Sequence, residues 1–370
     1  MPPLIKQLLS RLHGKPLERE ELLELLDTAL GIEPATVYAA TVLEGQRVEA
    51  EHWRLGGSRC RADRIWETKS SVKLEIRSRH DPGSRESETK YLVYGLRHEA
   101  RPDVVTLLAF KDRMAFYDGI RRWVHFNKRD LVSPALSDRR FRHILEAFQG
   151  TENLSGLVVT RASVRLRMEP QAERASVGFT SVAWPGVPLP QAFQWVWDNN
   201  GWFRTLTFDA LRGHHEVGRF SLGRRGEVSA TQRFSAAFRA LCVPLGSTFA
   251  EDERAFGHRA RRDLKFREVR PLAIEYGRGI FSDASAIRRL ASALRLFPNG
   301  VVSVYHGNPY LHAAILDQVD GSSTELWVTN AGRILLVPQM RATVWGLKRV
   351  VQHIYDTFAE GEVTDVSVPA

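Results

Sequence analysis

Three residues in the first third of the chain could together activate a water molecule on a magnesium ion. Glu67 and Lys69 form an acid-x-Lys pattern on an expected strand, and Asp103 supplies a second carboxylate. Nucleases of the restriction-endonuclease type need such a set, because carboxylates hold the metal and the metal activates the water. However, Asp103 follows the acid-x-Lys pattern instead of preceding it, and so short a pattern often arises by chance. A magnesium-dependent nuclease is therefore an alternative hypothesis and not the leading one.

Cationic side chains gather in stretches that also carry aromatic residues. Residues 121–142 hold seven cations and two acids, and residues 254–270 again hold seven and two. On the expected strand 160–168, arginines alternate with apolar residues, which predicts one basic face and one core face. Guanidinium groups bind phosphate through two hydrogen bonds and stack on bases, so these stretches favour a nucleic-acid partner. The candidate nucleic-acid-binding residues are Arg121, Arg122, Lys128, Arg129, Arg139, Arg140, Arg161, Arg165, Arg167, Arg224, Arg225, Arg259, Arg261, Arg262 and Lys265.

The same charges allow two other interpretations. A run of cations is often a solvated face, and a basic surface also fits an acidic protein partner. No RNP, helix-turn-helix or zinc-finger pattern accompanies the cations. A scaffold that docks an acidic protein is therefore a third hypothesis.

Other catalytic and cofactor patterns are incomplete or missing from the sequence. Gly277-Arg-Gly279 stands where a dinucleotide fingerprint would begin, but serine replaces its third glycine. His312 and Asp317 have opposite parity on one expected strand, so their side chains should point to opposite faces. The sequence has no Walker A lysine loop, no HExxH and no GxSxG. We therefore expect no cofactor, no metal and no catalysis by this chain.

The C-terminal hundred residues carry the clearest signals of secondary structure. Short apolar runs between residues 271 and 338 predict strands, and turn residues separate them. Apolar residues at helical spacing predict one helix that begins at Ser282 or Asp283 and a second that begins at Thr343. The order of strand, helix, three or four strands and helix predicts a two-layer α/β sandwich.

The remaining sequence predicts mainly antiparallel sheets with packed helices, so the expected fold class is multi-domain α+β. Hairpins are expected from residue 36 to 126, including strands at 113–119 and 122–126. A charged connector is expected at 246–270. The expected domains are a helical segment at 1–33, a β-rich domain with a closing helix at 34–150, a mixed α/β domain with the connector at 151–265, and the C-terminal two-layer α/β domain at 266–370.

Composition limits the class of protein. The chain has 370 residues, of which 43% are apolar and 26% charged, and its formal net charge is +9. Arginine outnumbers lysine by 43 to 9. No apolar run approaches the roughly 18 residues that span a bilayer, so no membrane is expected. Cys60 and Cys242 stand far apart without a CxxC pattern, which predicts a reducing, cytoplasmic setting.

These observations lead to one principal hypothesis. The chain is expected to be a non-catalytic, nucleic-acid-binding subunit of a larger cytoplasmic complex, of the repair or anti-invader defence type. Protein partners are expected as well as DNA or RNA. The charge, the size and the missing catalytic patterns carry this hypothesis.

Overall fold

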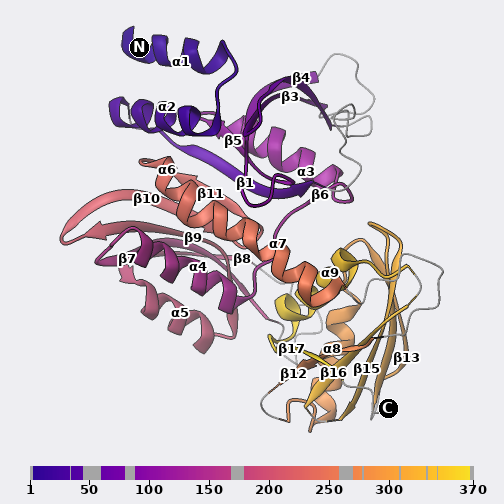
Figure 1. Cartoon of the computed structure of the whole chain (residues 1–370). Coiled ribbons are helices and arrows are strands. Elements are labelled where there is room, and N and C mark those ends of the chain that lie inside the picture. Colours follow the sequence, from indigo (N-terminus) through magenta and orange to yellow (C-terminus); the bar gives the residue numbers. More distant parts are fainter. Residues whose placement is uncertain are drawn as a thin grey trace. The chain divides into compact units, whose positions relative to one another are not determined.

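The protein has an α+β fold with two antiparallel sheets (Figure 1). The computed structural model describes residues 3–33, 35–44, 60–79, 88–167, 179–257, 270–276, 279–307, 310–330, 332–339 and 341–366. Contacts group the chain into two compact units. Unit 1 comprises residues 1–163, 181–195 and 203–249, and unit 2 comprises residues 164–180, 196–202 and 250–370.

The larger sheet lies mainly in unit 1 and has 11 strands in the order β2-β3-β4-β5-β1-β11-β10-β9-β7-β8, with β6 paired to β1. The strands are β1 (Val37–Glu44), β2 (Cys60–Glu67), β3 (Ser71–Arg79), β4 (Glu88–Arg97), β5 (Val104–Phe110), β6 (Leu131–Val132), β7 (Gly156–Leu166), β8 (Phe179–Pro188), β9 (Gly201–Arg212), β10 (His215–Gly223) and β11 (Glu227–Ala230). Strands β1 and β11 pair antiparallel, although about 190 residues separate them in sequence. This pairing joins the expected 34–150 and 151–265 segments through one sheet.

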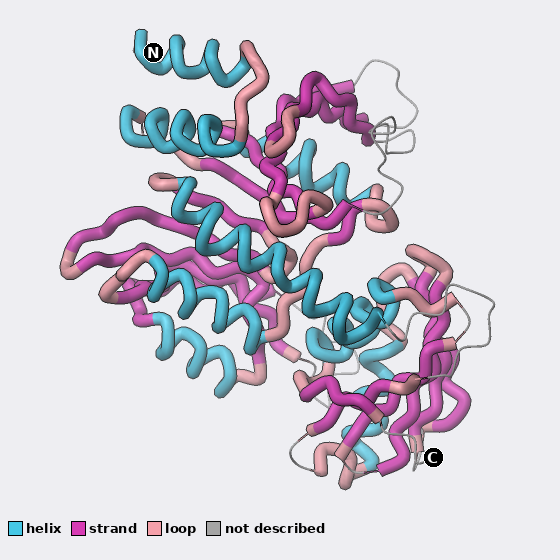
Figure 2. The backbone as a smooth tube through the Cα atoms, in the orientation of Figure 1, coloured by secondary structure: helices cyan, strands magenta, loops and turns pink. Residues whose placement is uncertain are grey.

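Helices pack along the strands (Figure 2). They are α1 (Pro3–His13), α2 (Arg19–Ile32), η1 (Ala115–Arg121), α3 (Arg122–Phe126), α4 (Asp138–Thr151), α5 (Leu189–Asp198), α6 (Phe234–Ala237), η2 (Phe238–Cys242) and α7 (Val243–Phe256). On one face of the larger sheet, Phe148 of α4 contacts Phe208 and Phe220 at ring-centroid distances of 5.8 and 5.1 Å. On the other face, η1 and α3 cover the β1–β5 half, where Phe116 and Trp123 enter the core.

Two expectations for unit 1 were wrong. Residues 113–119 and 122–126 do not form strands, because they belong to η1 and α3. Buried residues recur there at a spacing of four, as in Phe116, Ile120 and Val124, which is a helical period. The expected connector at 246–270 begins as helix α7, whose Leu245 and Phe249 are fully buried. Residues 258–269 lie outside the described part of the chain.

Unit 2 contains the smaller sheet and confirms the two-layer α/β prediction. Its six strands lie in the order β13-β14-β15-β16-β12-β17, and its helices α8 and α9 pack on one face around a shared core. These elements are β12 (Leu272–Glu275), α8 (Ala284–Leu294), β13 (Gly300–His306), β14 (Leu311–Asp317), β15 (Ser322–Asn330), β16 (Arg333–Pro338), α9 (Val344–Thr357) and β17 (Glu362–Asp365). The sequence did not predict β17.

The helix starts of unit 2 were predicted correctly. Asp283 accepts a hydrogen bond from the backbone N–H of Ser285, and Thr343 accepts one from Gly346, so each caps the first turn of its helix. The opposite parity of His312 and Asp317 is also confirmed, since the Asp317 side chain faces inward to Arg349. Among the described helices, none is long and apolar enough to cross a membrane.

Candidate nucleic-acid interface

A row of polar side chains crosses the face of the larger sheet opposite to α4. The strand register places Tyr38 of β1 opposite Ser229, Ser229 opposite Ser221, and Ser221 opposite Thr207. Residues directly opposite each other in antiparallel strands point to the same face. The hydroxyl groups of Ser221 and Ser229 lie 2.6 Å apart and share a hydrogen bond. In this part of the sheet, one face therefore carries hydroxyl groups, and the opposite face carries phenylalanine side chains.

Helix η1 forms a wall beside this polar row. It is a π-helix, a rare form that often occurs at functional sites. Its Phe116 stacks on Tyr38 at a centroid distance of 5.6 Å. The next residue, Tyr117, is 39% exposed, and the guanidinium groups of Arg113 and Arg121 lie 5.2 and 5.3 Å from the centre of its ring. An exposed aromatic ring near two cations is a suitable stacking site for a base.

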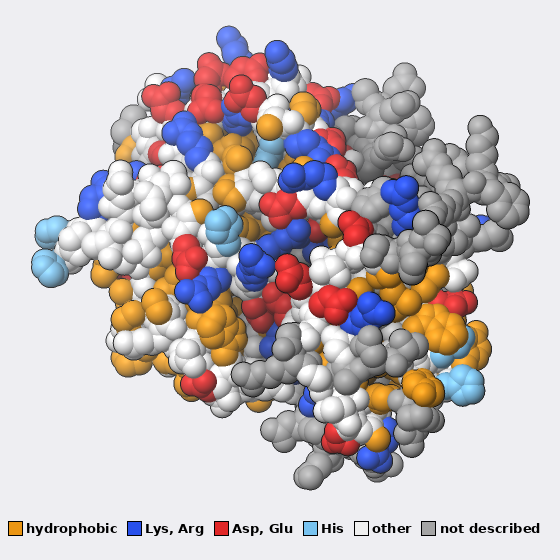
Figure 3. Space-filling model, turned by 60° about the horizontal axis from the view of Figure 1, so that its bottom comes forward, with side chains coloured by type: hydrophobic (Ala, Val, Ile, Leu, Met, Phe, Trp, Pro, Cys, Tyr) orange, Lys and Arg blue, Asp and Glu red, His pale blue; other side chains and the backbone are white. Residues whose placement is uncertain are grey.

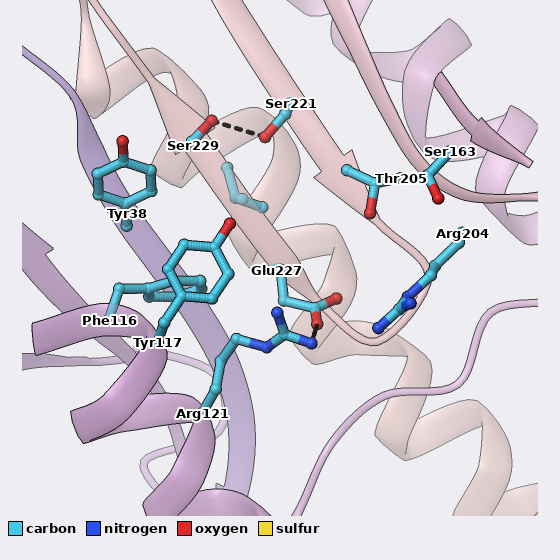
Figure 4. Close-up of a pocket in the computed structure, with 11 residues that line it drawn as sticks. Tyr38, Phe116, Tyr117, Arg121, Ser163, Arg204, Thr205, Ser221, Glu227 and Ser229 are labelled. Atoms are coloured by element: carbon cyan, nitrogen blue, oxygen red, sulfur yellow. Dashed lines mark hydrogen bonds and ion pairs between the residues drawn. The ribbon is translucent and has the colours of Figure 1, made fainter. Parts of the chain in front are cut away.

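A pocket of about 290 Å³ lies between η1 and strands β7, β9, β10 and β11 (Figure 4). Arg121 forms an ion pair with Glu227 at 3.5 Å, and Figure 4 shows Arg204 approaching Glu227 from the opposite side. The two arginines and one acid give the pocket a formal charge of +1. The residues that line it are Tyr38, Phe116, Tyr117, Arg121, Ser163, Arg204, Thr205, Ser221, Glu227, Val228 and Ser229.

Further positive charge lies close to the pocket residues in sequence. Partial burial lowers the pKa of His125, and the positive charges of Lys128 and Arg225 lower it further. Arg225 is exposed in the turn between β10 and β11. Gly226 holds this turn at a φ of +79°, where a Cβ would also approach Pro134. The turn thus fixes Arg225 near the end of α3.

The structure places several predicted cations at or near this interface. Arg121 lines the pocket, and Lys128 and Arg225 belong to the adjacent group. Arg161 is exposed on β7, between the buried Val159 and Ala162. Arg129 is exposed directly after Lys128.

Other predicted cations have structural partners. Arg224 is only 3% exposed and pairs with Asp138. Arg122 donates a hydrogen bond to the backbone carbonyl of Arg79, and Arg167 donates one to that of Tyr355. These contacts give Arg122, Arg167 and Arg224 roles in holding the fold.

Three further predicted cations lie on helix α4 and strand β7. Arg139 is exposed and Arg140 half-buried in the first turn of α4. Arg165 lies near His353, whose pKa is lowered mainly by burial and also by this charge. The predicted residues Arg259, Arg261, Arg262 and Lys265 lie outside the described residues.

The three residues of the nuclease hypothesis have separate partners, and Glu67 pairs with an arginine. The Arg97 guanidinium donates hydrogen bonds to Glu44 at 3.0 Å and to Glu67 at 2.8 Å, so it lies between the two side chains. Asp103 accepts from Arg101 at 2.6 Å. The charge of Lys69 acts on Glu18, whose pKa is lowered mainly by a hydrogen bond from Ser70. Among the described residues, no group of three His, Cys, Asp or Glu side chains could hold a metal ion.

Most of the pocket was not predicted from the sequence. Ser163, Arg204, Thr205, Ser221 and Ser229 were not among the candidates. The sequence does contain a pattern that could have indicated this part of the sheet, because polar residues alternate with buried apolar residues along β9, β10 and β11. That alternation marks an open sheet face, but only the strand register shows that the hydroxyls meet.

The fold and this interface define an α+β protein with an open, polar and weakly cationic sheet face. The chain matches no protein-family model, and no curated protein is detectably similar to it in sequence.

Proposed function

We propose that the protein binds nucleic acid through the pocket and the open face of its larger sheet. The observation that carries this proposal is the exposed Tyr117 with Arg113 and Arg121 close to its ring, at the side of a hydroxyl-lined pocket. A base can stack on Tyr117, and a phosphate can accept hydrogen bonds from Arg204 and the serine hydroxyls. Glu227 offers an acceptor to an amino group of a base or to a sugar hydroxyl.

A single-stranded ligand suits this site better than a duplex. A base can stack on a side chain only when its face is free, which is the case in single strands and loops. Two arginines of this unit could bind the backbone of such a strand, namely the pocket residue Arg204 and the exposed Arg225. We therefore expect single-stranded oligonucleotides to bind more tightly than duplexes of the same sequence.

We also propose that binding is not coupled to catalysis and that the chain acts within a larger assembly. The arrangement around Arg97 supports the first part, because a guanidinium group fills the space between the carboxylates that a metal would need. The net charge of +9 supports a complex that handles nucleic acid, such as a repair or anti-invader defence complex. Cys60 and Cys242 are buried free thiols, in keeping with a reducing cytoplasm.

The test is a comparison of three variants in a fluorescence anisotropy titration with labelled oligonucleotides. Tyr117→Leu removes the stacking ring, and Arg204→Glu reverses a pocket charge. Arg288→Glu is the matched control, because Arg288 is an exposed arginine on α8 in unit 2. We expect Tyr117→Leu to weaken binding by about 1–3 kcal/mol. Arg204→Glu should also weaken binding and lower the salt slope by about one.

The outcomes separate the three hypotheses. Equal loss in the pocket variants and in Arg288→Glu would show that only net charge matters and would contradict the proposed site. Cleaved oligonucleotide in the presence of magnesium would instead favour the nuclease. No binding even at low salt would leave the scaffold that docks an acidic protein.

A further inference from the structure

Among the described strands, β2, β8, β13 and β17 stand at the ends of the two sheet orders, and one of these four lacks the features that usually prevent edge pairing. Natural edges carry charges, prolines or short strands that block pairing with another chain. Strand β2 has four charged residues, β8 contains two prolines, and β17 begins and ends with an acid. Strand β13, Gly300–His306, has neither an Asp, Glu, Lys or Arg residue nor a proline. Within the described ranges, no strand pairs with its outer edge.

Exposed apolar side chains gather at this edge. Val301 and Tyr305 on β13 are 50% and 58% exposed, and Leu316, opposite Val301 on β14, is 44% exposed. Leu296 and Tyr310 flank the strand and are also more than half exposed. Figure 3 shows hydrophobic side chains next to histidines on this part of the surface. Such a group of apolar residues is typical of an interaction surface.

The edge is also held in a fixed shape. His312 of β14 lies opposite Trp327 of β15, and their rings stack at a centroid distance of 3.5 Å. The ring centroids of Tyr305 and His312 lie 4.8 Å apart. On the other face of β13, Val302 and Val304 pack against the core but remain half-exposed. A partner strand would therefore find a preformed edge and would complete the burial of both valines.

We propose that β13 pairs with β13 of a second copy of this chain, antiparallel about a two-fold axis, so that two six-stranded sheets become continuous. A two-fold interface uses the same surface on both copies, so it must be complementary to itself. β13 meets this requirement because it brings no like charges together. Its β-branched and aromatic residues form favourable cross-strand pairs with one another. The register shift between Val304 and His306 leaves Gly300–Val304 regular for pairing.

The test is the mass of the full chain in solution, measured without nucleic acid by light scattering and sedimentation over a concentration series. The double variant Val301→Lys with Ser303→Lys places two cations at the edge of each copy, and both positions are exposed, so the fold should be unaffected. The matched control is Ile65→Lys, a 49% exposed residue on the charged edge strand β2. We expect a dimer for the wild type and the control, and a monomer for the double variant.

A charge exchange makes the test specific for a second copy. Val301→Glu with Ser303→Glu should also be monomeric, whereas an equal mixture of the Lys and Glu variants should form a mixed dimer. A wild type that is monomeric throughout the series would overturn the proposal and leave this edge for a strand of another protein. A dimer that persists in the Lys variant would overturn it as well. Neither result depends on nucleic-acid binding, so this proposal and the proposed function can fail separately.

Discussion

The open faces of the two sheets differ in chemistry, although helices cover the opposite face of each sheet. In unit 1 the strand register aligns Tyr38, Ser229, Ser221 and Thr207, and arginines border this row. In unit 2 it aligns His312, Trp327 and Leu335, with Tyr305 next to His312. Hydroxyls and guanidinium groups suit a charged and hydrated ligand, whereas stacked rings and aliphatic groups suit a protein surface. One architecture thus presents two open faces of different chemistry, and we propose a different partner for each.

The largest expected effect distinguishes the covered face of the larger sheet from its open face. Phe148→Ala should lower the free energy of unfolding by about 3–5 kcal/mol, because it leaves a cavity against Phe208 and Phe220. Denaturant titration monitored by circular dichroism measures this change. A loss below about 1 kcal/mol would mean that α4 is not packed on this face as described.

A second prediction compares the loss of the exposed tyrosine on one open face with the loss of the exposed tyrosine on the other. Tyr117→Ala should weaken binding of single-stranded oligonucleotides by about 1–3 kcal/mol, because the stacking ring is lost. Tyr305→Ala should leave that affinity unchanged and should weaken self-association instead. Anisotropy and sedimentation on both variants measure the two effects. Equal effects on oligonucleotide binding would remove the distinction between the two faces.

A third prediction concerns a buried carboxylate beside an arginine, which occurs in both units. Burial raises the pKa of Glu44 from its ordinary 4.5 to about 7, although Arg97 opposes this, and burial also raises the pKa of Asp317 beside Arg349. A raised pKa means that the folded state favours the protonated acid. The stabilising contribution of Glu44 is therefore full below pH 4.5 and is lost as the pH rises through 7.

The corresponding variant is Glu44→Gln, which keeps the shape but cannot ionise. At pH 8 it should be more stable than the wild type by on the order of 1–3 kcal/mol, and the difference should shrink towards pH 5. Thermal or denaturant unfolding at several pH values measures this. The control is Glu99→Gln, whose side chain is 89% exposed. A stability difference that grows as the pH falls would contradict the raised pKa.

The smallest expected effect lies within the polar row itself. Ser229→Ala removes the hydrogen bond to Ser221, which should cost about 1 kcal/mol of unfolding free energy and not more. Denaturant titration on this variant and on Ser221→Ala would also show coupling between the two positions. A loss as large as that of Phe148→Ala would mean that the row is part of the core.

Local signals explain why unit 2 could be predicted well. Asp283 and Thr343 cap helices directly, and Asp320-Gly321 turns between two short apolar strands. Most neighbouring strands there are also neighbours in sequence, so the meander follows from the order of elements. Its last strand, β17, was missed because only Val363 in it is apolar.

Long-range pairing explains why the interface of unit 1 could not be predicted. Tyr38 and Ser229 become neighbours only through the pairing of β1 with β11, and nothing in the local sequence of either strand specifies that pairing. The apolar residues around Phe116 were assigned to a strand because aromatic and β-branched residues favour strands. Their spacing of four residues, which a π-helix accommodates, was the better signal. The candidate cations were chosen from the sequence because they are arginines or lysines in basic stretches. Which of them form ion pairs with acids depends on the fold, as the pair of Arg224 and Asp138 shows.

The most direct test of the central claim is hydrogen exchange measured by mass spectrometry with and without a single-stranded oligonucleotide. The account predicts slower exchange in peptides that cover 113–126, 203–207 and 219–229, and unchanged exchange in β13 and β14. Protection confined to other parts of the chain, or no binding at all, would contradict the assignment of the open face of the larger sheet as the nucleic-acid interface.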